Sequence, residues 1–384
     1  MKWKFYSLAF VAGMSILTAC SSDDNNDNDG NGGNGNGNEI ENGTILKGTI
    51  TSDVTLAAGN TYKLSGEYIV EEGATLHIEE GVKIIAVYDD IADYILVKQG
   101  GKINAVGTPD KPIVMTSEKE EPGAWGGIHI CGRAHTNAEG GKGSSEIGGA
   151  VYGGNDDADN SGTLQYIRLE YTGFAFDEEH EANGISFYGV GNGTIVDHCQ
   201  AYKGSDDGFE FFGGSVNVSN LVAVSCSDDS FDWTEGWNGK GTNLVAYQEA
   251  ESTLGYDCDC LMECDNNGSN NAATPVAHPV LKNLILVGNG GSKQGIRLRA
   301  GTEVEIDNAK VCGKGQPLTV ETALTENALK NGTSKLTNIT LTSELSCKEG
   351  IYTHADFIAV TSNKVDANLS YSSFEDIKKE CSWM

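Results

Sequence analysis

Short segments in which apolar and polar residues alternate recur through the middle of the chain. In each segment the second and fourth residues are apolar and the third is polar or charged. A period of two residues is typical of β-strands, and it places the second and fourth side chains inside and the third outside. The segments occupy residues 184–187, 208–211, 230–233, 261–264 and 295–298.

A second pattern, a turn residue followed by an apolar strand, repeats at intervals of 22 to 40 residues. Asparagine, which tolerates the left-handed conformation of a tight turn, holds the first position in five of seven cases. The shortest intervals fit one coil of a parallel β-helix, and the longer ones fit a coil plus a loop. A leucine-rich-repeat solenoid needs a fixed leucine spacing, so the variable intervals argue against it. The first positions are Tyr166, His198, Asn220, Asn243, Asn283, Asn308 and Asn338.

The remaining sequence fits the same all-β architecture. Residues 74–78, 95–97 and 112–115 also have the pattern of strands, and no convincing amphipathic helix precedes the last dozen residues. Residues 374–378 predict one short helical turn. We therefore expect a single-stranded parallel β-helix solenoid with long loop insertions over 44–345, followed by a C-terminal end or cap over 346–384.

Composition and charge narrow the function classes. The chain has 384 residues, of which 50 are Gly and 6 are Pro, and its net charge is −29. Many glycines with few prolines suit a fold with many tight turns and exclude collagen and Pro-rich linkers. Because the phosphate backbone of a nucleic acid would repel so acidic a protein, we expect no nucleic-acid partner. Cations and neutral or cationic ligands remain.

The first twenty residues have the features of an export signal. Lys2 and Lys4 precede an apolar run over 5–19, which is short for a membrane span but suits a signal-peptide core. The run ends in Leu-Thr-Ala-Cys, which resembles a bacterial lipobox. This resemblance implies removal of 1–19 and acylation of Cys20, for example with palmitate, as a lipid anchor. An ordinary signal peptide with a chance cysteine is the alternative.

Residues 20–43 predict a lipidated, disordered acidic Asn/Gly tether, because their composition cannot bury apolar surface. The start, Ser21-Ser22-Asp23-Asp24, resembles a surface-export signal of Gram-negative lipoproteins. It implies attachment to the outer membrane, facing the cell exterior. A solvated spacer in the periplasm is the alternative.

Several longer runs resemble a family of proteins. They occupy residues 100–108, 112–117, 125–128, 152–162 and 204–214. Together they resemble uncharacterised bacterial surface and secreted proteins of the right-handed parallel β-helix, pectate-lyase-like superfamily, over roughly residues 70–315. The resemblance implies the right-handed fold and the compartment. It leaves the function open, because the superfamily contains lyases, hydrolases and adhesins.

Acidic residues recur at matching positions of successive coils. The pairs Asp206-Asp207 and Asp228-Asp229 are 22 residues apart. Strand alternation also predicts one outward column made of Ser186, Glu210, Asp232, Glu263 and Arg297. Carboxylates about 4.8 Å apart repel one another. A cation, a raised pKa or nearby basic residues must compensate; the basic candidates are Lys203, Lys240, Arg297 and Arg299.

Two groups of residues are candidate calcium ligands. Asp157, Asp159 and Ser161 have the spacing of the front half of a calcium loop. The twelfth position of that loop is Arg168, which excludes an EF-hand but not a calcium turn. The second group is made of Asp206, Asp207, Asp228 and Asp229. Solvated acidic loops are the alternative in both cases.

The acidic column also permits catalytic interpretations. A polygalacturonase-like enzyme would use paired aspartates as acid and base, although the Gly-His-Gly element expected with them is missing. A pectate-lyase-like enzyme would use calcium and an Arg or Lys base. The candidate catalytic residues are Asp206, Asp207, Glu210, Asp232, Glu263 and Arg297.

The aromatic residues divide into two groups. Phe209, Phe211, Phe231 and Trp233 occupy inward positions and predict stacking in the core. A second group falls in expected loops, where aromatic rings can serve as platforms for sugars. These candidate ligand-binding residues are Tyr171, Phe174, Phe176 and Trp237.

Nine cysteines remain besides Cys20, and an odd number leaves at least one free thiol. Cys258, Cys260 and Cys264 form a cluster that favours a local disulfide or buried thiols. Cys347 and Cys381 are candidates for a disulfide that staples the C-terminal end, because export favours oxidation.

These features predict a lipid-anchored cell-surface β-helix protein that binds an extracellular glycan or another surface ligand, with calcium as a structural or bridging ion. Two alternatives stay open. The first is a polysaccharide lyase or glycoside hydrolase that uses the acidic face, and the second is an adhesin with a protein partner.

Overall fold

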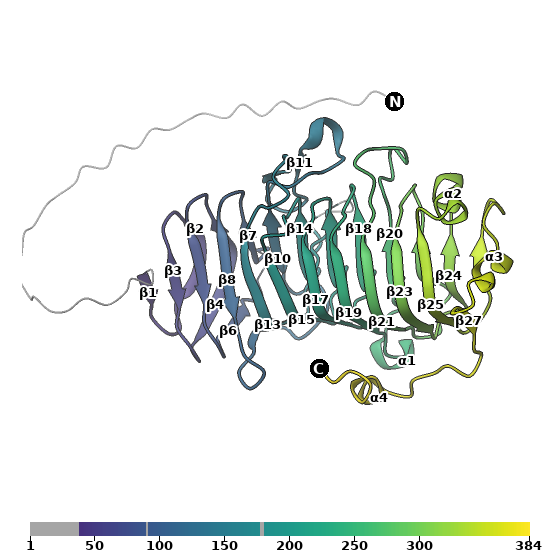
Figure 1. The fold of residues 1–384 in the computed structure, drawn as a ribbon. Coiled ribbons are helices and arrows are strands. Elements are labelled where there is room, and N and C mark those ends of the chain that lie inside the picture. Colours follow the sequence, from purple (N-terminus) through teal and green to yellow (C-terminus); the bar gives the residue numbers. More distant parts are fainter. Residues whose placement is uncertain (1–37, 90, 177–179) are drawn as a thin grey trace, which may run out of the picture. The chain divides into compact units, whose positions relative to one another are not determined.

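The alternating segments form parallel strands that wind into a solenoid (Figure 1). The structure is a computed structural model and describes residues 38–89, 91–176 and 180–384. Each coil contributes one segment to each of three stacked parallel sheets. Crossovers between parallel strands are right-handed in nearly all proteins. The predicted right-handed parallel β-helix is therefore confirmed.

The first and second sheets share most of their strands, because one long strand per coil bends from one sheet into the other. The first sheet begins with β1 (Asn38–Ile40), β3 (Val54–Leu56), β5 (Thr75–Ile78) and β8 (Lys102–Val106). The second begins with the first parts of β2 (Ile45–Ile50) and β4 (Thr61–Val70), then β6 (Lys83–Ala86) and β9 (Ile113–Ser117), and ends with β27 (Lys364–Val365). The shared strands are β13 (Gly162–Glu170), β15 (Ile195–Tyr202), β17 (Asn217–Val224), β19 (Lys240–Tyr247), β21 (Val280–Val287), β23 (Glu305–Cys312) and β25 (Lys335–Leu341).

The third sheet consists of short strands and carries the acidic residues. After the second parts of β2 and β4 it contains β7 (Tyr94–Val97), β10 (Ile128–Cys131), β14 (Ile185–Tyr188), β16 (Phe209–Phe212), β18 (Phe231–Thr234), β20 (Met262–Cys264), β22 (Gln294–Leu298), β24 (Gln316–Val320) and β26 (Ser346–Cys347). The coil strands run from Asn38 to Val365. They extend past the expected limits of 44 and 345.

The asparagine turn lies where each shared strand bends between the first and second sheets. All seven turn residues have positive φ, from 51° at Tyr166 and His198 to 62° at Asn308. In the pairing register Leu221 faces Leu244 and Leu244 faces Leu284. Asn220, Asn243 and Asn283 therefore lie in one stack, as the spacing predicts.

The core is one continuous column of buried side chains inside the coils. Phe209 stacks on Phe231 with ring centroids 5.6 Å apart, and Phe187 stacks on Phe211 at 5.0 Å. Trp233 is also buried. The predicted core stacking is confirmed, and it follows from the parallel register, which places equivalent side chains of successive coils in contact.

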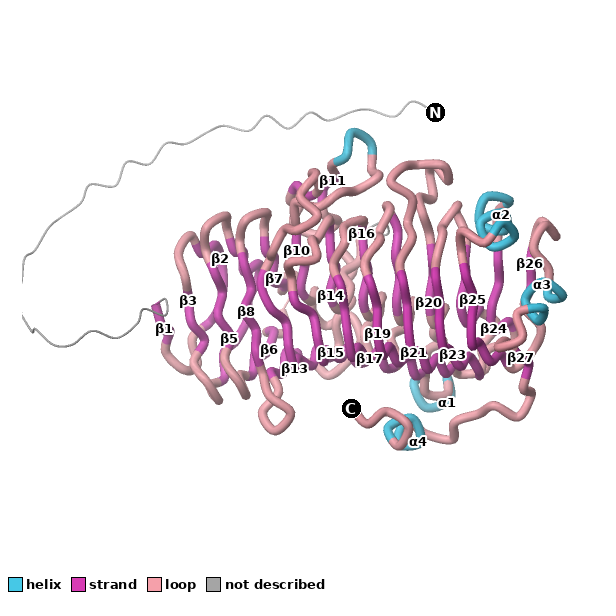
Figure 2. Tube along the Cα trace, viewed as in Figure 1, coloured by secondary structure: helices cyan, strands magenta, loops and turns pink. Residues whose placement is uncertain are grey.

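Insertions and helices lie outside the coils (Figure 2). A loop between β10 and β13 contains the 3₁₀ turn Glu139–Gly141 and the hairpin of β11 (Gly143–Ser144) and β12 (Val151–Tyr152). The helices are α1 (Glu251–Leu254), α2 (Ala323–Asn331), α3 (His354–Ala359) and α4 (Phe374–Lys378). The helical turn α4 is as expected, whereas α1, α2 and α3 precede the last dozen residues, where the sequence predicts no helix. No helix in the described part of the chain is long and apolar enough to span a membrane.

The last residues, 366–384, form a C-terminal strap that folds back along the second sheet (Figure 1). Ile377 and Cys381 of the strap are buried against an outward apolar stripe that includes Val222, Val245 and Val287. The strap thus covers apolar side chains that the coils turn away from the core.

The cysteine predictions are corrected in part. All nine cysteines in the described residues are free thiols. Cys347 packs against the main core and Cys381 against the outer stripe, so the predicted staple does not form. Cys258, Cys260 and Cys264 are buried thiols, one of the two outcomes expected. Cys20 and the acidic tether to residue 37 lie outside the described residues.

Candidate functional site

The acidic column of the third sheet has the predicted register. Ser186 pairs with Glu210, Glu210 with Asp232, Asp232 with Glu263, and Glu263 with Arg297. The neighbours of each residue along its strand are buried in the core, as period-two alternation requires. The third-position side chains of successive coils therefore stand side by side on the outer surface of the third sheet.

A second row of acidic residues lies in the turns just before these strands. The Oδ1 atom of Asp207 accepts the backbone N–H of Asp229 at 2.8 Å, and the Oδ1 atom of Asp229 accepts that of Cys260 at 2.6 Å. Asn183 begins this ladder by accepting the N–H of Asp207 at 3.2 Å. Each turn is thus fixed to the next coil by a side-chain oxygen, which holds the carboxylates in place.

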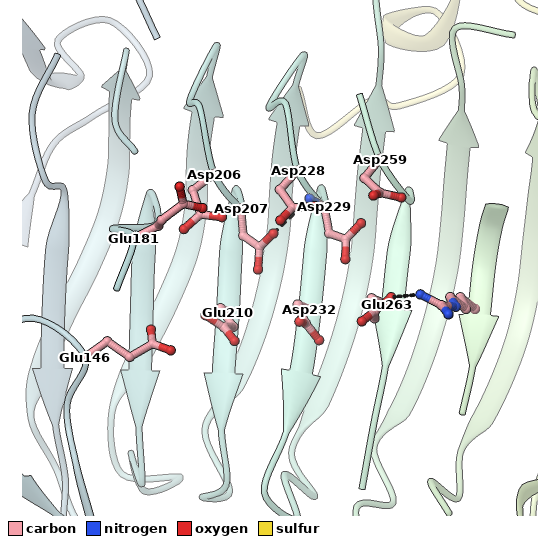
Figure 3. A pocket seen from close by; sticks show the side chains of 11 residues that line it. Glu146, Glu181, Asp206, Asp207, Glu210, Asp228, Asp229, Asp232, Asp259 and Glu263 are labelled. Atoms are coloured by element: carbon pink, nitrogen blue, oxygen red, sulfur yellow. Dashed lines mark hydrogen bonds and ion pairs between the residues drawn. The ribbon is translucent and has the colours of Figure 1, made fainter. Parts of the chain in front are cut away.

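The two rows face one open cavity of about 390 Å³ (Figure 3). We call it the acidic cleft. Ten carboxyl groups and one guanidinium line it: Glu146, Glu181, Asp206, Asp207, Glu210, Asp228, Asp229, Asp232, Asp259, Glu263 and Arg297. All six candidate catalytic residues and the second group of candidate calcium ligands therefore meet here. Glu146, Glu181 and Asp259 were not proposed as site residues, because they come from irregular loops without periodicity.

Burial and mutual repulsion raise the pKa values of these carboxyl groups. Burial, followed by the charge of Asp228, raises the pKa of Asp206 to about 8. Burial raises the pKa of Glu146 to about 7 and that of Asp228 to about 6. The same causes, burial first, raise the pKa values of Asp207, Glu210, Asp229 and Asp232 well above the ordinary range. At neutral pH the cleft therefore holds protons unless a cation replaces them.

Among the described residues, ion pairs with lysine and arginine gather at one end of the cleft. Glu263 forms ion pairs at 2.7 Å with both Arg297 and Arg299, and Lys293 pairs with Asp259. The prediction that Lys203 and Lys240 compensate the charge of the acidic column is wrong. Lys203 pairs with Glu249 at 3.1 Å, and Lys240 is an exposed residue of the first sheet. Compensation from basic side chains is thus concentrated around Glu263 and Asp259.

Among the residues that the structure describes, four groups offer three ligand atoms within 4.8 Å of one another. Three of the groups consist of carboxylates alone, the ligands that hard cations such as Ca²⁺ prefer. They are Asp206/Asp207/Asp228, Asp207/Glu210/Asp232 and Asp229/Asp232/Glu263. Asp232 belongs to two of these groups, and its Oδ1 atom is buried without a hydrogen-bond partner.

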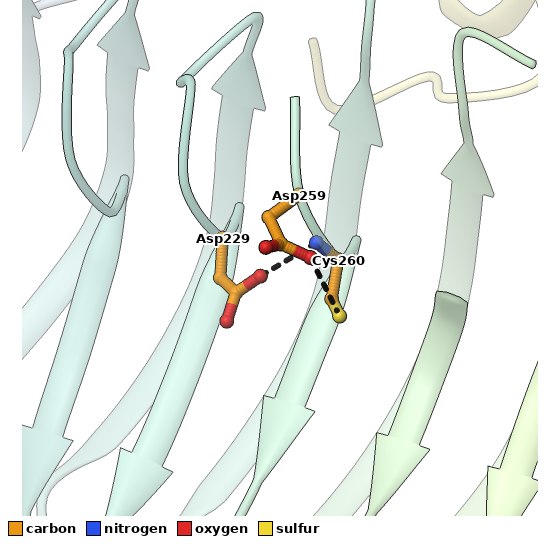
Figure 4. A group of neighbouring side chains, drawn as sticks. All are labelled: Asp229, Asp259 and Cys260. Atoms are coloured by element: carbon orange, nitrogen blue, oxygen red, sulfur yellow. Dashed lines mark hydrogen bonds between the residues drawn. The ribbon is translucent and has the colours of Figure 1, made fainter. Parts of the chain in front are cut away.

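The fourth group combines Asp229, Asp259 and Cys260 (Figure 4). The Sγ atom of Cys260 donates to Oδ1 of Asp259 at 3.3 Å. Burial, followed by the charges of Asp229 and Asp259, raises the pKa of the Cys260 thiol far above its ordinary value. A protonated thiol is a poor metal ligand, so the three carboxylate groups suit a cation better.

The residues of the first candidate calcium turn have other hydrogen-bond partners or bond one another. Oδ1 of Asp157 accepts a hydrogen bond from Nδ1 of His135 at 2.6 Å, whereas Asp159 accepts one from Ser161 at 3.3 Å. The calcium turn at Asp157, Asp159 and Ser161 stays a prediction.

The candidate sugar platforms separate into core and surface. Trp237 is 1% exposed and stacks on Phe211 with centroids 4.2 Å apart, so its assignment to a ligand-binding loop is wrong. Its indole N–H donates to the carbonyl of Val216 at 3.2 Å. Tyr171 is partly buried and meets Tyr202 edge to face. The buried Trp237 therefore offers no open ring face to a sugar.

Phe174 and Phe176 remain at the surface, in a turn that also carries Glu181. Phe176 is 39% exposed and meets Phe174 edge to face at 5.2 Å. Phe174 lines a neighbouring pocket of about 330 Å³ together with Tyr88, and a bridge between Ala175 and Glu181 closes the turn. One short segment therefore contributes an aromatic residue to this pocket and a carboxylate to the acidic cleft.

The fold and the site define a right-handed parallel β-helix protein with an acidic cleft on its third sheet. The chain belongs to the pectate-lyase-like beta-helix domain family, whose family model matches residues 48–383. No curated protein and no solved structure matches the chain significantly.

Proposed function

We propose that this protein binds an extracellular glycan through divalent cations, calcium first, held in the acidic cleft. One observation carries the proposal: two carboxylate groups share Asp232, whose Oδ1 atom is buried without a hydrogen-bond partner. Ca²⁺ takes six to eight oxygen ligands in flexible geometry. Three carboxylates leave positions that the hydroxyl or carboxylate oxygens of a bound sugar can fill.

The aromatic residues beside the cleft support a sugar ligand. Phe174, Phe176 and Tyr88 present partly exposed rings next to the segment that contributes Glu181. Aromatic rings cover the apolar C–H faces of sugars, while cations and polar groups contact their oxygens. A glycan bound along the third sheet would meet both kinds of surface.

The surroundings of Arg297 disfavour a lyase. A general base must lose its proton, but Arg297 lies 2.7 Å from Glu263 and 3.2 Å from Glu321. Although burial acts in the opposite direction, these two partners raise the pKa of Arg297 above its already high ordinary value. A guanidinium held in this way serves as a fixed positive charge rather than as a base.

A glycoside hydrolase is the second candidate. Asp206 and Asp228 offer carboxylate oxygens within 4.8 Å of each other, and burial, followed by neighbouring carboxylates, raises the pKa of both groups. Such a pair can share one proton, so that one carboxyl group acts as an acid and the other as a base. An acid and a base in one cleft are what hydrolysis of a glycosidic bond requires. Measurement of product release separates this candidate from binding alone.

The sequence supports attachment of the domain to the outer membrane. Acylation of Cys20 would supply the anchor, and the Asn/Gly-rich sequence that follows it would supply the tether. The cleft would then face the exterior, where polysaccharides are available.

The test uses residues 36–384, which form one compact unit, with a panel of immobilised glycans in calcium or in EGTA. Calcium-dependent retention without product release is the expected result. The Glu210→Gln/Asp232→Asn variant should lose retention. The exposed control Asp110→Asn/Glu344→Gln, with the same change in charge, should keep it. The proposal would be contradicted if no glycan of the panel were retained better in calcium than in EGTA, and released oligosaccharides would favour the hydrolase.

A further inference from the structure

In two of the seven coils, a residue other than asparagine occupies the turn between the first and second sheets. Asn220, Asn243 and Asn283 follow the left-handed turn and continue a side-chain ladder, whereas Tyr166 and His198 adopt the same conformation with φ of 51°. Histidine, like asparagine, is enriched in this conformation, but tyrosine seldom adopts it. Tyr166 is therefore not the residue that the turn itself favours, and its presence needs another reason.

The two aromatic rings form a flat wall. The rings of Tyr166 and His198 stack with centroids 4.4 Å apart and planes 22° from parallel. The C-terminal strap ends against this wall, where Nε2 of His198 donates to the carbonyl of Trp383 at 3.2 Å. The Trp383 ring meets His198 edge to face, with centroids 6.2 Å apart. Segments almost 200 residues apart in sequence thus build one aromatic corner.

This corner borders a pocket of about 440 Å³, distinct from the acidic cleft because it lies on the second sheet rather than the third. Rings of Tyr166, Phe374 and Trp383 line it together with the polar groups of Arg168, Gln200 and Lys378. A concave pocket with aromatic walls and a few convergent polar groups is the usual form of a small-ligand site.

The charges of the pocket favour a neutral ligand. Arg168 pairs with Glu170, and Lys378 pairs with Glu375 at 2.8 Å, so both cations have an acidic partner. Nη1 of Arg168 also donates to Gln200 at 2.8 Å, which orients the guanidinium. The guanidinium carries five N–H donors, more than these two contacts use. Such donors suit hydroxyl groups, and the rings suit the apolar faces of a pyranose.

We infer that the pocket between Tyr166, His198 and Trp383 is a second ligand site, which takes a neutral sugar ring without a metal ion. The site goes beyond the proposed function, because none of its residues lines the acidic cleft. Its ligand would be a neutral oligosaccharide, whereas the cleft would act through calcium.

The test titrates the purified protein with neutral hexasaccharides (cello-, xylo-, manno- and chitohexaose), using polygalacturonate as the anionic comparison. Saturation-transfer NMR and tryptophan fluorescence report binding, since Trp125, Trp233 and Trp237 are buried and Trp383 is partly exposed. We expect at least one neutral hexasaccharide to bind equally in calcium and in EGTA. Tyr166→Asn and Trp383→Ala should each weaken this binding by about tenfold or more.

A stability measurement separates a binding role from a structural one. Tyr166→Asn installs the residue that the turn prefers, so its melting temperature should equal or exceed that of the parent. The reciprocal control, Asn308→His, breaks a 2.9 Å ladder bond to Asn283 away from the pocket, so it should melt lower and keep binding.

Three results would overturn the inference: no neutral hexasaccharide binds, Tyr166→Asn binds like the parent, or Tyr166→Asn melts well below it. A hexasaccharide that binds only in calcium would also overturn it and assign that binding to the cleft. Failure of the cleft proposal alone would appear as normal metal-free binding here together with no calcium-dependent retention.

Discussion

The Nδ2 atom of Asn243 donates to Oδ1 of Asn220 at 2.7 Å, one coil away. Asn283 donates to Asn243 at 3.0 Å and Asn308 to Asn283 at 2.9 Å, so the amides form a ladder parallel to the solenoid axis. The sequence predicts the stack but not its chemistry, because the spacing of the asparagines does not indicate which groups their amides contact. The ladder ends at aspartates on both sides, because Asn220 donates to Oδ1 of Asp197 at 2.6 Å and Asn338 donates to Oδ1 of Asp307 at 2.6 Å.

The ladder makes its central member sensitive to substitution. Asn243→Leu removes one donor and one acceptor and leaves the amides of Asn220 and Asn283 without these partners. We expect a loss of about 1–3 kcal/mol in the free energy of unfolding, measured by urea titration. The exposed control Asn155→Leu should change it by less than about 0.5 kcal/mol. Equal stability of the two variants would contradict a structural role for the ladder.

Calcium should raise the melting temperature of the protein. A ligand that binds only the folded state adds about 2.7 kcal/mol at a concentration one hundred times its Kd. In Glu210→Gln/Asp232→Asn this increase should shrink, because both substitutions remove ligands from the shared groups. In EGTA the same variant should melt above the parent, since the two amides need no protons to avoid repulsion from the neighbouring carboxylates. No response of the parent to calcium would refute cation binding in the cleft.

Without calcium, stability should fall as the pH rises from about 5 to 8. The folded state keeps protons on Asp228, Glu146 and Asp206 up to pKa values of about 6, 7 and 8, whereas unfolded carboxyl groups release them near 4. Stability gained from a raised pKa is complete at low pH and is lost as the pH passes the folded pKa. Melting curves at several pH values in EGTA measure this decline.

Calcium should flatten the same pH profile, because it replaces the protons at high pH. Asp93 provides an internal reference. Its pKa is raised to about 7 by burial, and it lies outside the cleft. The Glu210→Gln/Asp232→Asn variant should therefore retain part of the decline in EGTA. An identical profile in calcium and in EGTA would show that protons and calcium do not compete.

Two aromatic residues, one buried and one exposed, give a matched pair of variants. Trp237→Ala removes a buried ring from the core and should cost about 3–5 kcal/mol in urea unfolding. Phe176→Ala removes a 39% exposed ring and should leave stability nearly unchanged while lowering glycan retention. Full retention by a folded Phe176→Ala variant would remove this ring from the proposed glycan surface.

Localisation tests the N-terminal interpretation. Cys20→Ala should release the protein from the membrane fraction, because the acylated residue is lost. Asp23→Ala/Asp24→Ala should leave it membrane-bound but protected from protease added to whole cells. Cleavage of this double variant as fast as the parent would show that the two aspartates are not a surface-export signal.

The sequence predicted those parts of the site that depend on periodicity. Glu210, Asp232 and Glu263 followed from strand alternation and the repeated turn, which together fix the register. Glu146 and Glu181 reach the cleft from insertions whose path depends on packing against the coils. Nothing in the sequence around Glu146 and Glu181 indicates that their side chains lie at the cleft.

The prediction of a site residue was wrong where the local sequence resembled a loop. Trp237 follows a strand in a Gly-rich turn, yet its ring returns to the core beneath Phe211. Asp157 has the spacing of a calcium turn, but its carboxylate also accepts a hydrogen bond from His135, in a different segment. In both cases the contact is distant in sequence.

The C-terminal strap changes how the solenoid should unfold. Coils that contact only their neighbours form a one-dimensional array, which can fray from either end. The strap connects β23, through Lys310 and Glu380, with β15, through His198 and Trp383. Loss of the last coils therefore also withdraws packing from coils far along the axis. Fraying of the C-terminal coils is therefore coupled to the stability of the central coils, which contain β15.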